Sequence, residues 1–145
     1  MKWIKDLVGA DISINGIDHV AIVVSDMDRS IEFYAGVLGL TLIQDGRKEG
    51  GKKKTFLGTK SRTLVALTED TKRSKGMGEY VEGVSHVAFK VDDVEKASAA
   101  LRKKGVTFIE EKVDKGGKAK AYHFLDPDGL ELEIYGETGV AVPPY

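Results

Sequence analysis

The alternation of hydrophobic and polar residues changes period along the chain, and the same succession of changes occurs twice. Residues 17–24 and 84–91 are rich in Val and Ile, as expected of strands. Each is followed by apolar residues at helical spacing, from about Asp26 to Leu38 and from about Asp93 to Lys104. Three short strands are predicted after each helix, near 40–45, 53–58 and 63–68, and near 106–113, 119–125 and 130–135. The pattern therefore predicts two βαβββ units.

Local signals support these limits. Ser25 or Asp26 can accept hydrogen bonds from the free amides at the start of the first helix. Gly39 and Gly105 suit the left-handed residue that follows a helix. Residues 126–129, Asp-Pro-Asp-Gly, form a turn signal between the last two strands. The final two strands are thus predicted to form a hairpin.

The two units also resemble each other in sequence. Gly, His, Val, Ala, Val and Asp of residues 16–27 recur in residues 83–94, at a spacing of 67 (86 minus 19). Residues 50–56 resemble residues 116–122 at a spacing of 66. Two matches in the same order, one residue out of register, indicate a duplicated unit with a small deletion.

We therefore predict one α+β domain, in which two βαβββ modules form a curved mixed sheet around a metal-binding cleft. The modules span residues 16–68 and 83–136, and residues 69–82 form a polar linker. Residues 1–15 are predicted to be an N-terminal extension, and residues 137–145 an irregular tail.

Composition narrows the functional classes. The 145 residues suffice for one domain, and 41% hydrophobic with 31% charged residues is typical of globular proteins. No apolar run reaches the roughly 20 residues of a membrane span, and no secretory signal is evident. A net charge of −1 does not favour nucleic acid. The lack of cysteine excludes thiolate ligands and disulfides and fits a reducing compartment. Together these features predict a cytoplasmic protein without membrane or nucleic-acid partners.

Lysines and arginines are concentrated between Arg47 and Arg62. Such a run is usually a solvated loop. The alternative is a cationic rim that attracts an anionic substrate.

Strand alternation brings candidate metal ligands onto one face. His19 and His86 hold equivalent positions of the repeat and face away from the predicted helices. In the last strand Glu131 and Glu133 face the same side, because Leu130, Leu132 and Ile134 pack on the helix. Two imidazoles and one carboxylate, His19, His86 and Glu133, suit Fe(II), Mn(II) or Zn(II) and leave positions open for substrate. The alternative is a pair of buried structural histidines inherited by duplication.

His123 is the third histidine, predicted to lie beside Glu133 across the hairpin. Its imidazole could serve as a catalytic general base or acid, since its pKa lies near neutrality. The alternative is a histidine without contact to substrate.

The sequence motifs resemble those of the vicinal oxygen chelate superfamily. This superfamily includes glyoxalase I, extradiol dioxygenases, methylmalonyl-CoA epimerase, fosfomycin-resistance transferases and bleomycin-binding proteins. The resemblance covers about residues 16–136, and its most specific parts are residues 17–21, 25–34, 37–40, 85–89 and 124–133. It implies a divalent metal (Fe, Mn, Zn or Ni) on His19, His86 and Glu133. Ala66 stands where glyoxalase I and the epimerase have a further Glu or Gln ligand, so the donor set resembles that of extradiol dioxygenases and fosfomycin transferases.

The resemblance implies a metal-dependent enzyme, dioxygenase-like or lyase-like, that acts on a small molecule with vicinal oxygens. The alternatives are a thiol transferase of the fosfomycin-resistance type and a non-catalytic protein that binds and sequesters antibiotic-like molecules. Relatives of this length are usually homodimers, so we predict a homodimer, possibly with exchanged modules.

Overall fold

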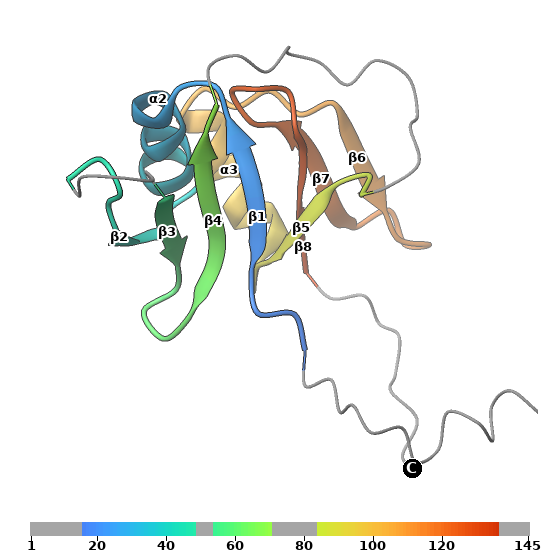
Figure 1. Cartoon of the computed structure of the whole chain (residues 1–145). Coiled ribbons are helices and arrows are strands. Elements are labelled where there is room, and N and C mark those ends of the chain that lie inside the picture. Colours follow the sequence, from blue (N-terminus) through green and yellow to red (C-terminus); the bar gives the residue numbers. More distant parts are fainter. Residues whose placement is uncertain (1–15, 49–53, 71–83, 137–145) are drawn as a thin grey trace, which may run out of the picture.

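Two four-stranded sheets with the same topology make up the described part of the chain, residues 16–48, 54–70 and 84–136 of a computed structural model (Figure 1). Their strand orders are β1-β4-β3-β2 and β5-β8-β7-β6. In each sheet the first strand is parallel to the last, and the remaining pairs are antiparallel. The predicted pair of βαβββ modules is confirmed.

Most elements lie close to their predicted limits, but the strands predicted to start at residues 17, 84 and 106 begin at Val20, Val87 and Glu110. The first sheet contains β1 (Val20–Val24), β2 (Thr41–Gln44), β3 (Lys54–Gly58) and β4 (Thr63–Glu69). The second contains β5 (Val87–Lys90), β6 (Glu110–Val113), β7 (Ala119–Leu125) and β8 (Glu131–Tyr135). The helices are α2 (Met27–Ile31), η1 (Glu32–Val37) and α3 (Val94–Lys103).

Three predicted segments fall largely outside the described residues. These are the extension 1–15, the tail 137–145 and most of the linker 69–82, whose first residue, Glu69, belongs to β4. Within the described residues, no helix has the length and apolar character needed to cross a membrane.

Both helices begin and end as their sequence signals predict. Asp26 and Asp93 are extended N-cap residues whose carboxylates accept the amides of Arg29 at 3.1 Å and Lys96 at 3.0 Å. The following glycines, Gly39 and Gly105, have φ values of +86° and +91°.

The first helix differs from the prediction in its second half. Residues Glu32–Val37 form a π-helix, and the Leu38 amide donates to the Phe33 carbonyl at 2.8 Å. The apolar spacing of Met27, Ile31 and Tyr34 is compatible with both helix types over so few turns. The periodicity therefore predicts the buried face of the segment but not its pitch.

Each helix packs on the sheet of its own module, α2 on β4 and α3 on β7 and β8. Ile22 and Val24 of β1 are buried on this side, whereas Ala21 and Val23 are exposed on the other. The predicted division of β1 into a helix-facing and an outward face is therefore confirmed.

Strand register shows which positions of the two modules correspond. Ala21 pairs with Ala66 between β1 and β4, and Ala88 pairs with Glu133 between β5 and β8. Both residues of the second pair follow those of the first by 67. Ala66 is therefore the first-module counterpart of Glu133.

The same register corrects the predicted one-residue deletion before the third strand. Phe56 pairs with Ala66, and His123 pairs with Glu133, so the spacing in these strands is again 67 and not 66. The counterpart of Phe56 is His123 and not Tyr122. A shift by one residue would turn every side chain of the strand to the opposite face, which strand pairing forbids. The spacing of 66 arose from the glycine- and lysine-rich loop residues before the strand.

Candidate metal site

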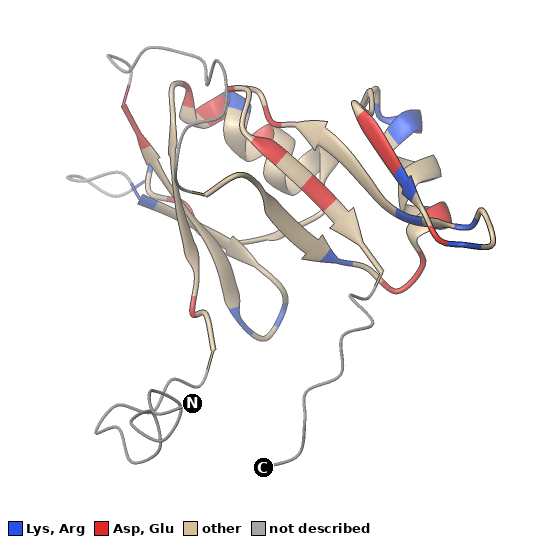
Figure 2. Cartoon of the chain, turned by 90° about the vertical axis from the view of Figure 1, so that its right-hand side faces the viewer, with Lys and Arg blue, Asp and Glu red and all other residues tan. Residues whose placement is uncertain are grey.

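Four polar side chains meet on the face of the second sheet that points away from α3. They are His86, directly before β5, Glu131 and Glu133 of β8, and His123 of β7. Figure 2 shows acidic positions of this sheet in red, alternating with uncharged ones along the strand. Alternation places Glu131 and Glu133 on one face, and cross-strand pairing places His123 opposite Glu133.

Glu133 lies between the two imidazole rings. Its Oε2 atom is 2.8 Å from His86 Nε2 and 3.5 Å from His123 Nε2. The two ring centroids are 5.2 Å apart in an edge-to-face arrangement. The predicted proximity of His123 to Glu133 is thus confirmed.

Glu131 and Ser85 approach the opposite nitrogens of the rings. Glu131 Oε1 is 3.4 Å from His123 Nδ1, and Glu131 Oε2 is 3.9 Å from His86 Nδ1. Ser85 Oγ is 2.7 Å from His86 Nδ1. One donor atom each from His86, His123 and Glu131 fits within 4.8 Å, a spacing that suits metal ligands. Sequence reasoning placed Glu131 on the correct face but did not make it part of the site.

The inner members of the cluster are buried without full hydrogen bonding. The side chains of His123 and Glu133 are each 3% exposed, against 32% for His86 and 31% for Glu131. Both ring nitrogens of His123 and Glu133 Oε1 form no hydrogen bond within the described part of the chain. Buried polar atoms nearly always have a partner, because leaving one unsatisfied costs about 1–3 kcal/mol. A cation between these atoms would supply that partner, so the donor set fits a metal.

His19 lies apart from this cluster. Its Nδ1 is 2.6 Å from Asp18 Oδ2, and its side chain is 41% exposed. It is not a member of the metal-spaced group found among the described residues. The structure therefore brings two of the three predicted ligands together, His86 and Glu133, and ligation by His19 stays a prediction.

A groove of about 890 Å³ separates the two modules and is lined by His19 and His86. Its walls are mainly apolar and include Val20, Val87 and Phe89. Of the four clustered side chains, His86 is the one that lines this groove.

The cation-rich segment is only partly described. Arg47 binds Asp45 and Asp28 through its guanidinium group, each at 2.5 Å. Hydrogen bonding to Arg47 lowers the pKa of Asp45 to about 2. Arg62 lines the groove and donates to the Ile17 carbonyl at 2.8 Å. Arg47 is thus engaged in ion pairs. Among the cations of this segment that the structure describes, Arg62 is the one that lines the groove.

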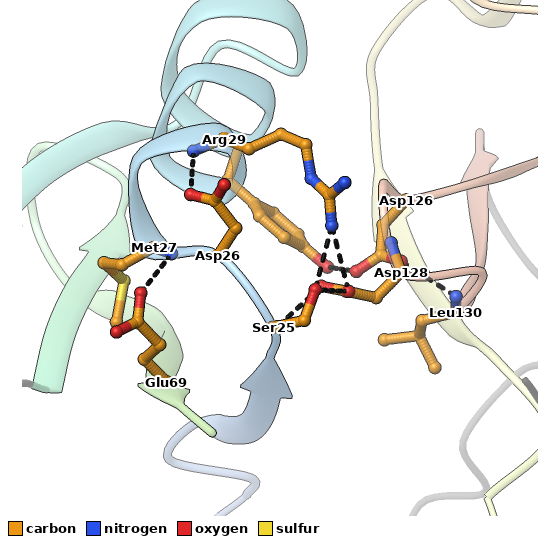
Figure 3. A network of polar contacts seen from close by, with 9 residues as sticks. Ser25, Asp26, Met27, Arg29, Glu69, Asp126, Asp128 and Leu130 are labelled. Atoms are coloured by element: carbon orange, nitrogen blue, oxygen red, sulfur yellow. Dashed lines mark hydrogen bonds and ion pairs between the residues drawn. The ribbon is translucent and has the colours of Figure 1, made fainter. Parts of the chain in front are cut away.

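A polar network holds the β7–β8 hairpin, and with it His123, against the first module (Figure 3). Tyr34 donates its hydroxyl to Asp126 Oδ2 at 2.8 Å. Arg29 donates to Asp128 Oδ1 at 3.2 Å and to Ser25 Oγ at 2.9 Å, and the Ser25 hydroxyl donates to the same Asp128 oxygen. The predicted turn therefore joins the two modules as well as the two strands.

Replacing Tyr34 with phenylalanine is expected to lower the free energy of unfolding by about 1–3 kcal/mol at pH 7, because Asp126 loses a buried donor. Burial, followed by the charge of Asp126, raises the pKa of Tyr34 far above its usual value. The stability that the neutral phenol contributes is present below pH 10, near the pKa in the unfolded chain, and declines above it by about 1.4 kcal/mol per pH unit. Urea unfolding between pH 7 and pH 11 should show the difference between wild type and variant shrinking only above pH 10. A constant difference in the free energy of unfolding between pH 7 and pH 11 would contradict a stabilising role of the neutral Tyr34 phenol.

Comparison with known proteins agrees with this architecture. Residues 16–134 match the family model of the Glyoxalase/Bleomycin resistance protein/Dioxygenase superfamily. The chain is 34% identical to the lactoylglutathione lyase of Haemophilus influenzae, over 80% of this chain and 88% of that one. It is 26% identical to the metallothiol transferase FosB of Staphylococcus epidermidis, over 88% and 85%. The crystal structure of a glyoxalase family protein from Enterococcus faecalis matches with a TM-score of 0.68 at 30% identity, over 83% and 97%.

The chain therefore belongs to the glyoxalase/bleomycin resistance/dioxygenase superfamily. Its relatives include proteins named as lyases and as a thiol transferase.

Proposed function

We propose that the protein is a divalent-metal-dependent enzyme that acts on a small molecule with adjacent oxygen atoms, by lyase-type chemistry. The observation that carries this proposal is the cluster of two histidines and two glutamates, in which His123 and Glu133 are buried with unpartnered donor atoms and His86 lines an apolar groove. The relatives named lactoylglutathione lyase favour lyase chemistry over ring cleavage.

A bound Zn, Ni, Mn or Fe ion would polarise a substrate oxygen and favour removal of a neighbouring proton. His86 and Glu133 would hold the ion, and His86 would also face a substrate in the groove. The sequence predicts His19 as a third ligand and His123 as the group that moves the proton. Glu131, one-third exposed beside both imidazoles, is a second candidate for proton transfer.

The experiment loads metal-free protein separately with Zn, Ni, Mn and Fe(II). Each form is assayed with the hemithioacetal of methylglyoxal and glutathione, with catechols under oxygen, and with a thiol plus an epoxide. We expect hemithioacetal turnover that a chelator abolishes and added metal restores. Oxygen-dependent catechol cleavage or thiol addition would instead identify the dioxygenase or transferase reaction. Failure to bind any of these metals would overturn the proposal.

The apolar groove favours a second candidate function, the binding and sequestration of an aromatic or drug-like molecule. Its volume of about 890 Å³ lies within the range of small-molecule sites. Calorimetric titration distinguishes the two functions, because sequestration by the apolar walls should survive chelation. Loss of binding on chelation would exclude this candidate.

We also propose that the protein forms a homodimer, in which His19 of one chain could approach His86 of the other. In the described part of the chain, β1, β2, β5 and β6 each pair on one side only, which leaves four sheet edges that a second copy could cover. Light scattering at micromolar concentration should give twice the mass of the 15.8 kDa chain. A monomer mass throughout the concentration range would contradict the proposal.

A further inference from the structure

We propose that Tyr34 of the first module is a positioning residue for the metal site of the second module. Through its hydrogen bond to Asp126, it fixes the β7–β8 hairpin that carries three of the four clustered polar side chains: His123, Glu131 and Glu133. The inference rests on the proposed metal dependence and is compatible with ligation by His19. It adds to the site a residue that acts through the hairpin and not by contact with the metal.

The turn of the hairpin lies close to the cluster along the chain. His123 lies opposite Glu133 in the strand register, and Asp126 follows His123 by three residues. Glu131 begins β8 directly after the turn. A displacement of the turn would therefore move all three side chains relative to His86, which precedes β5. A functional site must be held within about 0.5 Å of its productive geometry, so a small displacement is sufficient to weaken it.

Asp126 joins the turn to the first module through the two oxygens of its carboxylate. Its Oδ1 atom accepts the amides of Asp128 at 2.9 Å and Leu130 at 2.8 Å, which closes the turn (Figure 3). Its Oδ2 atom accepts the Tyr34 hydroxyl at 2.8 Å. Because Asp126 is only 5% exposed, loss of this donor would leave an oxygen of a buried carboxylate poorly satisfied. The carboxylate thus transmits the position of Tyr34 to the turn.

Tyr34 is itself held in place. It is fully buried, and its carbonyl accepts the Leu40 amide at 2.9 Å. Its ring packs edge-to-face on Phe33 with 5.3 Å between centroids, and Phe33 in turn lies 6.4 Å from Phe124 of β7. Alternation along β7 places Phe124 on the helix-facing side and His123 on the opposite face. The segment that contains Tyr34 therefore contacts β7 directly behind His123.

A second contact to the same turn is more exposed. Arg29 donates to Asp128 Oδ1 at 3.2 Å, and the two side chains are 41% and 14% exposed. Ion pairs that water reaches contribute little. The buried Tyr34 hydroxyl is therefore the stronger anchor.

The equivalent pair of residues in the other direction lacks this bond. The position in α3 that corresponds to Tyr34, eight residues after the helix cap (34 minus 26 and 101 minus 93), is Leu101. The residue 67 positions before Asp126 is Thr59, in the turn between β3 and β4. Leucine has no hydroxyl to donate, so the fold forms without such a bond there. In the sheet of Thr59, apolar residues also replace the polar cluster, at positions Phe56, Leu64 and Ala66.

The helical segment that presents Tyr34 also differs from its counterpart. The glycine after the first helix follows the cap by 13 positions (39 minus 26), and the glycine after α3 follows its cap by 12 (105 minus 93). The wider π-helical turns of Glu32–Val37 accommodate the extra residue, whereas α3 is α-helical throughout. Such π-helical turns occur frequently at functional sites. The change of pitch and the Tyr34–Asp126 bond thus occur together, opposite the module that holds the polar cluster.

The experiment titrates Co(II) into metal-free, full-length protein and records the visible spectrum of the bound ion. Tyr34→Phe keeps the ring and removes the hydroxyl, and Leu67→Ala, at a fully buried position of β4, is the control for lost stability. We expect Tyr34→Phe to weaken Co(II) binding by about 10-fold and to alter the spectrum, at the low end of the roughly 10- to 100-fold that groups supporting metal ligands contribute. Leu67→Ala should lose at least as much stability yet bind Co(II) within about twofold of wild type.

Unchanged Co(II) affinity and an unchanged spectrum in Tyr34→Phe would overturn the inference. An equal loss of affinity in Leu67→Ala would also overturn it, because the effect would then follow the stability of the whole protein and not the position of the hairpin.

A conservative variant, Asp126→Asn, tests the hydrogen bond itself. The carboxamide oxygen can still accept the turn amides, and the NH2 group can donate to the Tyr34 oxygen. Co(II) affinity should therefore stay within about threefold of wild type. Combining this variant with Tyr34→Phe removes the acceptor, so a loss of about 10-fold should return. A double variant that binds Co(II) as tightly as Asp126→Asn alone would contradict the inference.

Two negative results are distinguishable. Wild-type protein that binds neither Co(II) nor Zn(II) would refute the proposed function and this inference with it. Wild-type protein that binds metal, together with a Tyr34→Phe variant of equal affinity, would refute the inference alone.

Discussion

Replacing Glu133 with glutamine is expected to lower divalent-metal affinity by more than about 100-fold and to abolish metal-dependent turnover. Glu133 is 3% exposed and contacts the Nε2 atoms of His86 and His123 at 2.8 and 3.5 Å. The carboxamide keeps the shape of the side chain but loses the negative charge that would compensate a divalent ion. Outer hydrogen-bond partners of ligands are themselves worth roughly 10- to 100-fold in affinity, so loss of a direct ligand should exceed this.

The same substitution should leave the metal-free fold intact. Glutamine removes a charge whose burial is unfavourable, and its carbonyl oxygen can still accept a hydrogen bond from His86 Nε2. We therefore expect the free energy of unfolding without metal to fall by no more than about 1 kcal/mol. The control is Glu95→Gln, the same chemical change at an exposed position of α3, which should alter neither property.

Calorimetric metal titration and urea unfolding measure the two effects separately. A Glu133→Gln protein that binds metal as wild type does would exclude Glu133 from the site. A variant that is unfolded would show that Glu133 acts through the fold. Either result would make Glu131, the other carboxylate beside both imidazoles, the alternative carboxylate ligand.

Features determined by local sequence were predictable. Asp26 and Asp93 cap their helices, and the glycines after the helices adopt positive φ, because these preferences depend on a few adjacent residues. The pairing of His123 with Glu133 follows from the short turn between their strands, which fixes the register of the hairpin.

Features that depend on packing were not predictable. The π-helical turns of Glu32–Val37 bury the same apolar residues as an α-helix, so the pattern does not distinguish them. The position of His19 relative to His86 depends on how the two modules pack, and strand periodicity carries no information on this. Alternation with Glu133 assigns Glu131 to the same face of the sheet. Its proximity to both imidazole rings depends on the packed positions of the rings, which alternation does not give.

The largest loss of stability is expected from Phe124→Ala. Phe124 is fully buried on the helix-facing side of β7, where its ring packs 5.9 Å from Phe108 and 6.4 Å from Phe33, measured between centroids. Truncation of a buried phenylalanine costs about 3–5 kcal/mol, from lost burial and from the cavity that remains. A domain of this size has only about 5–15 kcal/mol in total, so the variant should be close to unfolding at 37 °C.

The matched control is Leu125→Ala, the next residue, which is 46% exposed at the end of the same strand. It should change the free energy of unfolding by about 0.5 kcal/mol or less, because surface positions seldom contribute more. Urea unfolding of both variants gives the comparison. Phe33 belongs to the first module and Phe108 to the second, so the loss at Phe124 would also measure how strongly the modules stabilise each other. A loss below about 1 kcal/mol would mean that neighbouring side chains refill the cavity, and that the core between the modules is looser than these ring contacts indicate.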